Sequence, residues 1–291
     1  MDREIWQWIC RAVHCADRRI PRLGRKPEYS DQLIVKMFFW ACFFHMPRCW
    51  ACDRNSYTSL ARPRRLPSVS QFCKRLHSQR VLDMIEAVNA YLLEQAPSTV
   101  IASFDGQPME LSNNTTDPDA HCGYANGRIR NGYKNHACVD ENGFIRGHIV
   151  HPMNVAEPST ARQSLVDVVE PDTLILADGN FDSAPLYEAL EARGATLITP
   201  LKGQSTSPAR LERMPMGRRL MIDMWHQARE LVSDLYRRRD NIERRFGNLV
   251  CVRGGLHSLP PFVRRLKRVR PWVAAKICLY HARLLARLCP S

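Results

Sequence analysis

Two aspartates and one glutamate are the side chains of this sequence whose types and placement could do chemistry. Asp105, in SFDGQ, and Asp178, in LADGN, each follow a short apolar segment that is typical of a buried strand. Open α/β sheets bind their ligands where strands end, so the two carboxylates could meet at one edge of a sheet. An Asp-Gly pair is also a common turn signal, and for either residue alone a turn is the better explanation.

A third carboxylate changes this balance. In YRRRDNIERRFG, Glu243 lies four residues after Arg239 and seven after Tyr236, so all three side chains share one face of a helix. Glu243 could be only an ion-pair partner of the neighbouring arginines. Together with Asp105 and Asp178, however, it completes a set of oxygen ligands that suits Mg²⁺ or Mn²⁺.

Such a set predicts phosphodiester chemistry. Two divalent ions about 4 Å apart can activate a water or a 3′-hydroxyl and stabilise the leaving oxygen of an in-line displacement. This reaction needs no protein nucleophile, in agreement with a sequence that has no convincing Ser/His/Asp set, Walker-type loop or His-Glu metalloprotease helix. We therefore predict that Asp105, Asp178 and Glu243 are catalytic metal ligands.

Charge is unevenly distributed along the 291 residues, which carry a net charge of +13. Residues 98–235 contain 12 Lys and Arg against 18 Asp and Glu, whereas residues 236–291 contain 14 against 2. Basic segments on both sides of an acidic centre favour a polyanionic partner, most naturally nucleic acid. The alternative is a solvated basic helix without a ligand, but arginines at this density repel one another unless something neutralises them.

Residues 1–97 are predicted to form a helical domain. Ser30 is a suitable N-cap for an apolar helix from Gln32 to Phe44. A basic loop, RPRRLP, then precedes two helices, of which the second spans Arg80 to Glu94. This pair is either a DNA-binding helix-turn-helix or two helices of a plain bundle.

After residue 98 the pattern changes to short β-branched segments. The predicted strands are Thr99 to Phe104, Lys134 to Val139, Phe144 to Val150, Thr173 to Ala177 and Ala195 to Pro200. The second and third form an antiparallel hairpin, while helices over Ser159 to Val169 and Ala184 to Arg193 make the later strands parallel. Long helices from about Leu231 to Leu249 and from Phe262 to Leu288 follow. The sequence thus predicts an α/β domain over 98–291, with a mixed sheet flanked by helices.

The order Asp105, Asp178, Glu243 and the signature Tyr236-x2-Arg239-x3-Glu243 resemble the DDE transposases of bacterial insertion sequences, in the group named for a Tyr-Arg-Glu-Lys motif. The similarity extends from about residue 28 onward and includes GYKNHACVDENG, HPMNVAEPSTA and LADGNFDS. It implies a ribonuclease H-like catalytic domain that binds two Mg²⁺ or Mn²⁺ ions, cleaves transposon ends and joins the freed 3′-hydroxyl to target DNA. It also implies that Tyr236 and Arg239 contact backbone phosphates and that the protein works as a homodimer on DNA.

The sequence departs from this motif at one point, because Val250 stands where the lysine is expected. Arg253, a turn later, could supply the missing phosphate contact, and Arg244 and Lys202 are further predicted DNA contacts. Val250 also motivates a second hypothesis, a decayed or repurposed copy that binds DNA without cutting it. A third is a nuclease of ribonuclease H type that acts on hybrids. The segment Leu201 to Glu230 is short, so we expect little or no inserted domain.

The remaining patterns favour a reduced, cytoplasmic protein. Eleven cysteines spread over the whole chain do not form a disulfide framework. The spacing Cys49-x2-Cys52, followed by Cys73 and His77, lacks the second close pair of a typical zinc site. The longest apolar run, Met37 to Met46, is too short to cross a bilayer, and the acidic N-terminus does not match a signal peptide.

Overall fold

A computed structural model gives the fold of residues 1–22, 24–25, 27–112, 116–125, 127–201, 211–256 and 258–289. They group into two units, Met1–Ala96 with Leu249–Ser291 (unit 1) and Pro97–Asn248 (unit 2). Unit 1 consists of helices and unit 2 is built around a sheet. The predicted fold class, an α/β protein with an all-helical N-terminal part, is confirmed.

Unit 1 packs its helices around a central apolar one. The described helices are α1 (Arg3–Arg19), α2 (Asp31–Phe43), α3 (Arg48–Ala51), α4 (Val69–Leu76), α5 (Gln79–Glu94) and α11 (Leu266–Leu288), with a 3-10 turn, η1 (Arg54–Ser56). As predicted, Ser30 caps α2, because its hydroxyl accepts a hydrogen bond from the backbone N of Leu33 at 3.2 Å. Most side chains of α2 are buried, so this helix forms the centre of the bundle.

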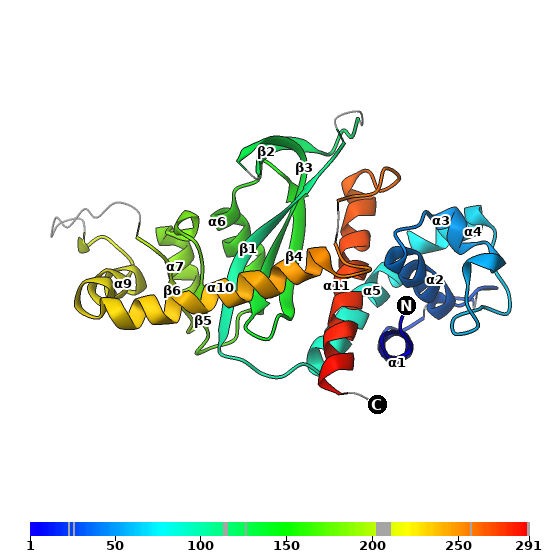
Figure 1. Cartoon of the computed structure of the whole chain (residues 1–291), viewed down its shortest axis with the longest axis horizontal. Coiled ribbons are helices and arrows are strands. Elements are labelled where there is room, and N and C mark those ends of the chain that lie inside the picture. Colours follow the sequence, from blue (N-terminus) through cyan, green and yellow to red (C-terminus); the bar gives the residue numbers. More distant parts are fainter. Residues whose placement is uncertain are drawn as a thin grey trace. The chain divides into compact units, whose positions relative to one another are not determined.

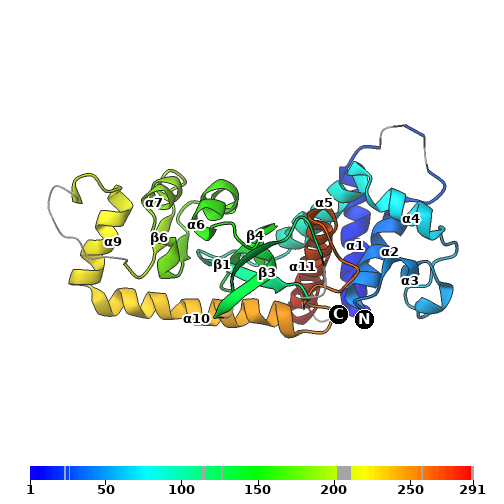
Figure 2. The same ribbon diagram turned by 90° about the horizontal axis from the view of Figure 1, so that it is seen from above.

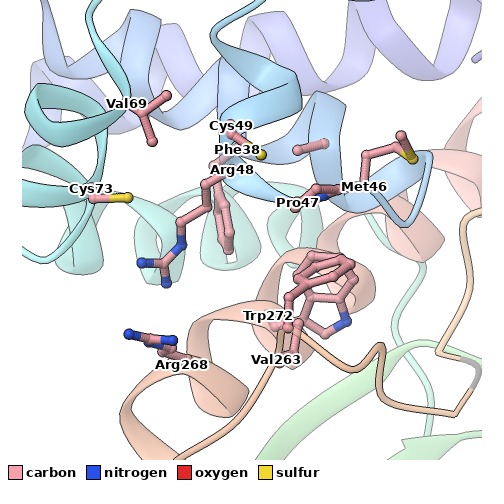
Figure 3. Close-up of a pocket in the computed structure, with 12 residues that line it drawn as sticks. Phe38, Met46, Pro47, Arg48, Cys49, Val69, Cys73, Val263, Arg268 and Trp272 are labelled. Carbon is pink, nitrogen blue, oxygen red and sulfur yellow. The ribbon is translucent and has the colours of Figure 1, made fainter.

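The helix α11 packs with the N-terminal helices. It contacts α1, α2 and α5, and its buried side chains include Trp272 and Ile277. An apolar pocket of about 260 Å³ has Phe38 of α2 and Trp272 of α11 in its wall (Figure 3). The structure differs here from the predicted domain 98–291, since residues 249–291 complete the core of unit 1, where the apolar surface of α11 is buried.

A buried carboxylate connects three helices of unit 1. Asp31 begins α2, has a side chain only 3% exposed, and forms ion pairs with Arg22, Arg75 and Arg80. Arg75 belongs to α4 and Arg80 to α5. Arg80 also donates a hydrogen bond to Asp17 in α1, at 2.7 Å. Because the carboxylate is shielded from water and fully paired, its charge holds these helix ends together.

Unit 2 contains a mixed sheet, which has six strands in the described residues. These are β1 (Ile101–Glu110), β2 (His121–Ala125), β3 (Arg128–Asp140), β4 (Ile145–Pro152), β5 (Leu174–Leu176) and β6 (Thr196–Ile198). The strand β3 pairs in antiparallel fashion with β1, β2 and β4, whereas β1, β5 and β6 are parallel. This order, antiparallel on one side of β1 and parallel on the other, is the ribonuclease H-like arrangement that we expected.

All five predicted strands are present, but the first two, which correspond to β1 and β3, are longer than predicted. The strand β1 continues to Glu110, β3 already begins at Arg128, and β2 was not predicted. The extra residues include Pro108 and Gly132, which have low strand propensity. They are strands because they pair with each other, as Met109 does with Tyr133, and such pairing cannot be read from local sequence.

The helices of unit 2 cover both faces of the sheet. They are α6 (Glu157–Thr160), α7 (Ala184–Glu191), α9 (Met216–Gln227) and α10 (Arg229–Cys251). Instead of one predicted helix over 159–169, α6 runs on into a π-helical turn, η2 (Ala161–Leu165), and a 3-10 turn, η3 (Val166–Val168). Figures 1 and 2 show α6 and α7 on one side of the sheet and α10 on the other. Within the described residues, no helix has both the length and the apolar character needed to cross a membrane.

Hydrogen bonds from two of its side chains attach the helix α9, which the sequence pattern did not predict, to the rest of unit 2. Arg218 donates two hydrogen bonds to the buried carboxylate of Asp182, each 2.8 Å long. Trp225 Nε1 donates to the carbonyl oxygen of Thr199, just after β6, at 2.9 Å. Because α10 begins two residues after α9 ends, these contacts also fix where α10 starts.

Replacing Asp31 tests the ion-pair network of unit 1. In Asp31→Ala three guanidinium groups lose a buried counter-charge, so we expect the free energy of unfolding to fall by about 3 kcal/mol. The control, Glu94→Ala, breaks the exposed ion pair with Arg19 and should cost at most about 1 kcal/mol. Urea denaturation followed by circular dichroism measures both losses. Equal losses would contradict the role given to Asp31.

Candidate active site

The register between β1 and β5 places Asp105 and Asp178 at the same level of the sheet. Ser103 of β1 lies opposite Leu176 of β5 in the parallel pair, and each aspartate follows two residues later. Neighbouring strands are about 4.8 Å apart. The register therefore places the backbone of these two predicted residues at neighbouring positions, just beyond the end of the parallel pairing of β1 and β5.

Asp178 also caps the 3-10 turn η4 (Gly179–Phe181). Its Oδ1 accepts a hydrogen bond from the backbone N of Asn180 at 2.7 Å, and its Oδ2 lies 3.4 Å from Nδ2 of the same residue. The turn function that Asp-Gly suggested is thus real at this position. A carboxylate has about four lone-pair sites, so this capping leaves acceptor capacity for a further ligand.

Asp105 is largely buried and lies in a negative field. Its Oδ1 accepts a hydrogen bond from the backbone N of Gly106 at 2.7 Å. Burial raises the pKa of Asp105 to about 6; the Gly106 hydrogen bond and Arg239 act in the opposite direction, and the carboxylates of Glu243 and Glu157 raise it further. The structure thus brings Glu243 within electrostatic reach of Asp105, as the prediction requires.

The helix α10 presents Tyr236, Arg239 and Glu243 on one face, as their spacing predicts. Arg239 forms an ion pair with Glu243, and its guanidinium carbon lies 5.9 Å from the ring centre of Tyr236. The pKa of the Tyr236 hydroxyl is raised, chiefly by burial, while Arg239 lowers it and the charges of Asp178 and Glu243 raise it. The face of α10 that carries the signature is therefore directed towards both aspartates.

The donor set fits a hard divalent cation in its chemistry. Three carboxylates come from β1, from the turn after β5 and from α10, and the mutual repulsion seen at Asp105 is what a bound cation would relieve. In the described residues, however, no three His, Cys, Asp or Glu side chains are arranged to hold a metal ion. The positive partner of Glu243 here is Arg239. If Glu243 bound a metal ion, the cation would thus replace Arg239 as the positive partner of this carboxylate.

Sequence reasoning missed a fourth carboxylate, that of Glu157 at the start of α6. Its Oε1 accepts a hydrogen bond from Nζ of Lys134 at 2.8 Å. A Cβ atom on Gly106 would lie 2.6 Å from the same oxygen, so any other residue there would require the side chain of Glu157 to shift. Because successive strand residues point to opposite faces, Glu157 acts on Asp105 from the other side of β1. Gly106, directly after Asp105, is the one signal in the sequence that points to it.

Of the other predicted DNA contacts, Arg244 does not share the face of α10 that carries the signature. Arg244 is exposed and, one residue after Glu243, is turned by about 100° around α10. Arg253 belongs to unit 1, where its guanidinium carbon lies 5.9 Å from the ring centre of Phe44. Lys202 lies outside the described residues. Val250, in place of the motif lysine, is within α10.

The histidines of the hairpin are interior residues of the sheet. Burial lowers the pKa of His136 to about 3 and that of His148 to about 4, so both are neutral at physiological pH. The rings of His136 and His151 lie 5.8 Å apart. Their positions along β3 and β4 are those of ordinary strand residues.

The comparisons with known proteins point to one family. The family model described as transposase DDE domain matches residues 96–257. Among solved structures, the piggyBac transposase synaptic complex with hairpin DNA has 12% identity and a TM-score of 0.48, over 98% of this chain and 72% of that chain. The Mos1 transposase paired-end complex with the left transposon end has 12% identity and a TM-score of 0.26, over 78% and 80%. No curated protein sequence matches.

The raised pKa of Asp105 predicts that this residue costs stability. Without divalent ions, the folded protein binds its proton more tightly than the unfolded chain, so stability falls as pH rises from about 4 to 6. Asp105→Asn, which keeps the shape and loses the charge, should raise the free energy of unfolding at pH 8 by roughly 1–3 kcal/mol. The gain should vanish below about pH 4. Urea denaturation in EDTA measures it, and a gain independent of pH would contradict the electrostatic cause.

Proposed function

The chain belongs to the transposase DDE domain family, and from this we propose that it cleaves DNA at transposon ends and joins the freed 3′-hydroxyl to target DNA. One observation carries the proposal. The parallel register of β1 and β5 sets Asp105 beside Asp178, and Glu243 of α10 lies within electrostatic reach of Asp105. The proposal is that these three acids, which are far apart in the sequence, act together in unit 2.

In this proposal Asp105, Asp178 and Glu243 hold two Mg²⁺ or Mn²⁺ ions. When bound, such ions activate the attacking water or hydroxyl and stabilise the leaving oxygen of the phosphodiester. The carboxylates supply the charge that gathers the ions, and burial of Asp105 keeps its oxygens out of bulk water. The capping bonds from Asn180 orient Asp178 before any ligand arrives.

Arg239 and Tyr236 then bind the DNA backbone. Arg239 lies beside Glu243 on the same face of α10, and its guanidinium could donate two parallel hydrogen bonds to a phosphate. The raised pKa of Tyr236 keeps its hydroxyl protonated at neutral pH, so it can donate a hydrogen bond to a phosphate oxygen. The ion pair between Arg239 and Glu243 thus holds both side chains in position before DNA binds.

We further propose that the partner is double-stranded DNA, with terminal inverted repeats bound by a homodimer in the bacterial cytoplasm or on the nucleoid. The charge distribution supports a polyanion, since residues 236–291 carry 14 Lys and Arg against 2 Asp and Glu. Unit 1 contributes the helices α4 and α5, which are separated by two residues. The apolar face of α5 packs on α1 and α11, so DNA contacts from a helix-turn-helix would come from its exposed face.

A second function, DNA binding without cleavage, is favoured by Val250. An uncharged side chain at this position of α10 removes the phosphate contact that the motif lysine would make. A decayed or repurposed copy would bind duplex DNA with a steep salt dependence and show no cleavage with any divalent metal. A nuclease acting on hybrids would instead prefer an RNA–DNA hybrid over a terminal-repeat duplex in competition.

Cleavage by the full chain tests the main proposal. With Mg²⁺ and a duplex that carries the terminal repeats of its element, the protein should produce nicks and joined products. Asp178→Ala should lower the cleavage rate by more than about 100-fold. Mutation of a residue that only orients a metal ligand already lowers metal affinity or activity by about 10–100-fold. Asp223→Ala, the same change at an exposed position of α9, is the control and should leave the rate unchanged.

The outcomes separate the three functions. Nicking that is lost in Asp178→Ala and kept in Asp223→Ala supports the transposase. Binding without nicking in Mg²⁺ or Mn²⁺ supports the non-cleaving copy, and preferential cleavage of hybrid supports the nuclease. Nicking that survives Asp178→Ala would refute the assignment of the carboxylates.

A further inference from the structure

A second basic surface lies on α10, away from the carboxylates. It is a groove of about 440 Å³ between α10 and the turn that joins β3 to β4, entirely within unit 2. Its polar lining consists of three arginines, two asparagines and one acid, namely Arg238, Arg244, Arg245, Asn241, Asn248 and Glu141. The side chains from α10 are exposed, so the groove is open to a large partner.

The helix itself separates this groove from the candidate active site. Val232, Ile242 and Phe246 are buried and form a stripe along α10. At about 100° per residue, Glu243 lies on one flank of that stripe, about 60° from its centre, and Arg238 lies on the other flank, about 80° away. One helix therefore carries two polar edges that face in different directions.

The two edges also differ in how their arginines are paired. Arg239, on the carboxylate edge, forms an ion pair with Glu243. Among the described residues, neither Arg238 nor Arg244 in the groove has an ion-pair partner. The one acid of the lining, Glu141, accepts a hydrogen bond from the hydroxyl of Thr99 at 2.7 Å. Arg238 and Arg244 thus present positive charge that no described ion pair neutralises.

We propose that this groove binds the phosphodiester backbone of a second DNA segment, separate from the one cleaved at Asp105, Asp178 and Glu243. Arginines and amides are the donors that proteins use most for phosphates, and they are the residue types that line it. Arg238 and Asn248 are ten residues apart, which spans about 15 Å along the helix or roughly four base steps of one strand. This inference rests on the proposed function in one respect, namely that the polyanion is DNA.

The experiment measures how salt weakens binding of a generic duplex that lacks terminal repeats, in EDTA so that no strand is cut. Each lost phosphate contact should reduce the slope of log affinity against log salt by about 0.9. We expect that reduction in Arg238→Gln and not in Arg238→Lys, which keeps the charge. Arg219→Gln, the same loss of charge at an exposed position of α9 outside the groove, is the matched control and should keep the wild-type slope.

A bridging assay then asks whether two DNA segments are held at once. A terminal-repeat duplex is fixed to beads, and retention of a labelled generic duplex by the bound protein is measured. Arg238→Gln should lower this retention while binding of the fixed duplex stays at the wild-type level. An equal loss of both would show a single DNA path and overturn the inference.

The groove and the proposed function can fail independently. Equal salt slopes for wild type, Arg238→Gln and Arg219→Gln would overturn the groove, whether or not the protein nicks DNA. Equal reductions in Arg238→Gln and Arg219→Gln would also overturn it, since the effect would then belong to net charge alone. Lack of nicking by every protein would overturn the proposed function and leave the binding result valid.

Discussion

The register of β1 against β5 is the constraint on which the candidate active site depends. Ser103 lies opposite Leu176, and its hydroxyl donates a hydrogen bond to the carbonyl oxygen of that residue at 2.5 Å. A slip of one residue would turn the β5 side chains to the other face and carry Asp178 out of line with Asp105. The buried side chains of Ala102 and Ile175, paired in the same ladder, make such a slip costly. Packing of the sheet thus fixes the spacing of the acids.

The packing that creates this site places Asp105 where its negative charge is unfavourable. Burial and neighbouring carboxylates both disfavour the charged form of Asp105, and Arg239 compensates only in part. Such unfavourable charge is common where function requires it, and the rest of the fold must supply the stability. In unit 2 part of that stability comes from a well-paired ion elsewhere, that of Asp182 with Arg218.

The sequence predicted what depends on local pattern and missed what depends on distant contacts. Alternating, β-branched segments located the strands that lead to Asp105 and Asp178, and helical spacing placed Tyr236, Arg239 and Glu243 on one face. Neither pattern could place Glu157, which is near Asp105 only because α6 folds across the sheet. The same holds for β2, whose residues become a strand through pairing with β3, and for α11, whose apolar surface could have met either unit.

The position of α11 in the chain has a consequence for how the protein is made. Residues 97–248 are continuous, so the sheet and its helices can fold as soon as they leave the ribosome. The bundle of α1, α2 and α5 is synthesised first but must wait for α11, which is translated after the whole sheet. Until then, the surfaces that α11 covers are open to other chains or to chaperones. Of the two units, the one whose synthesis begins earlier is thus the later to be complete.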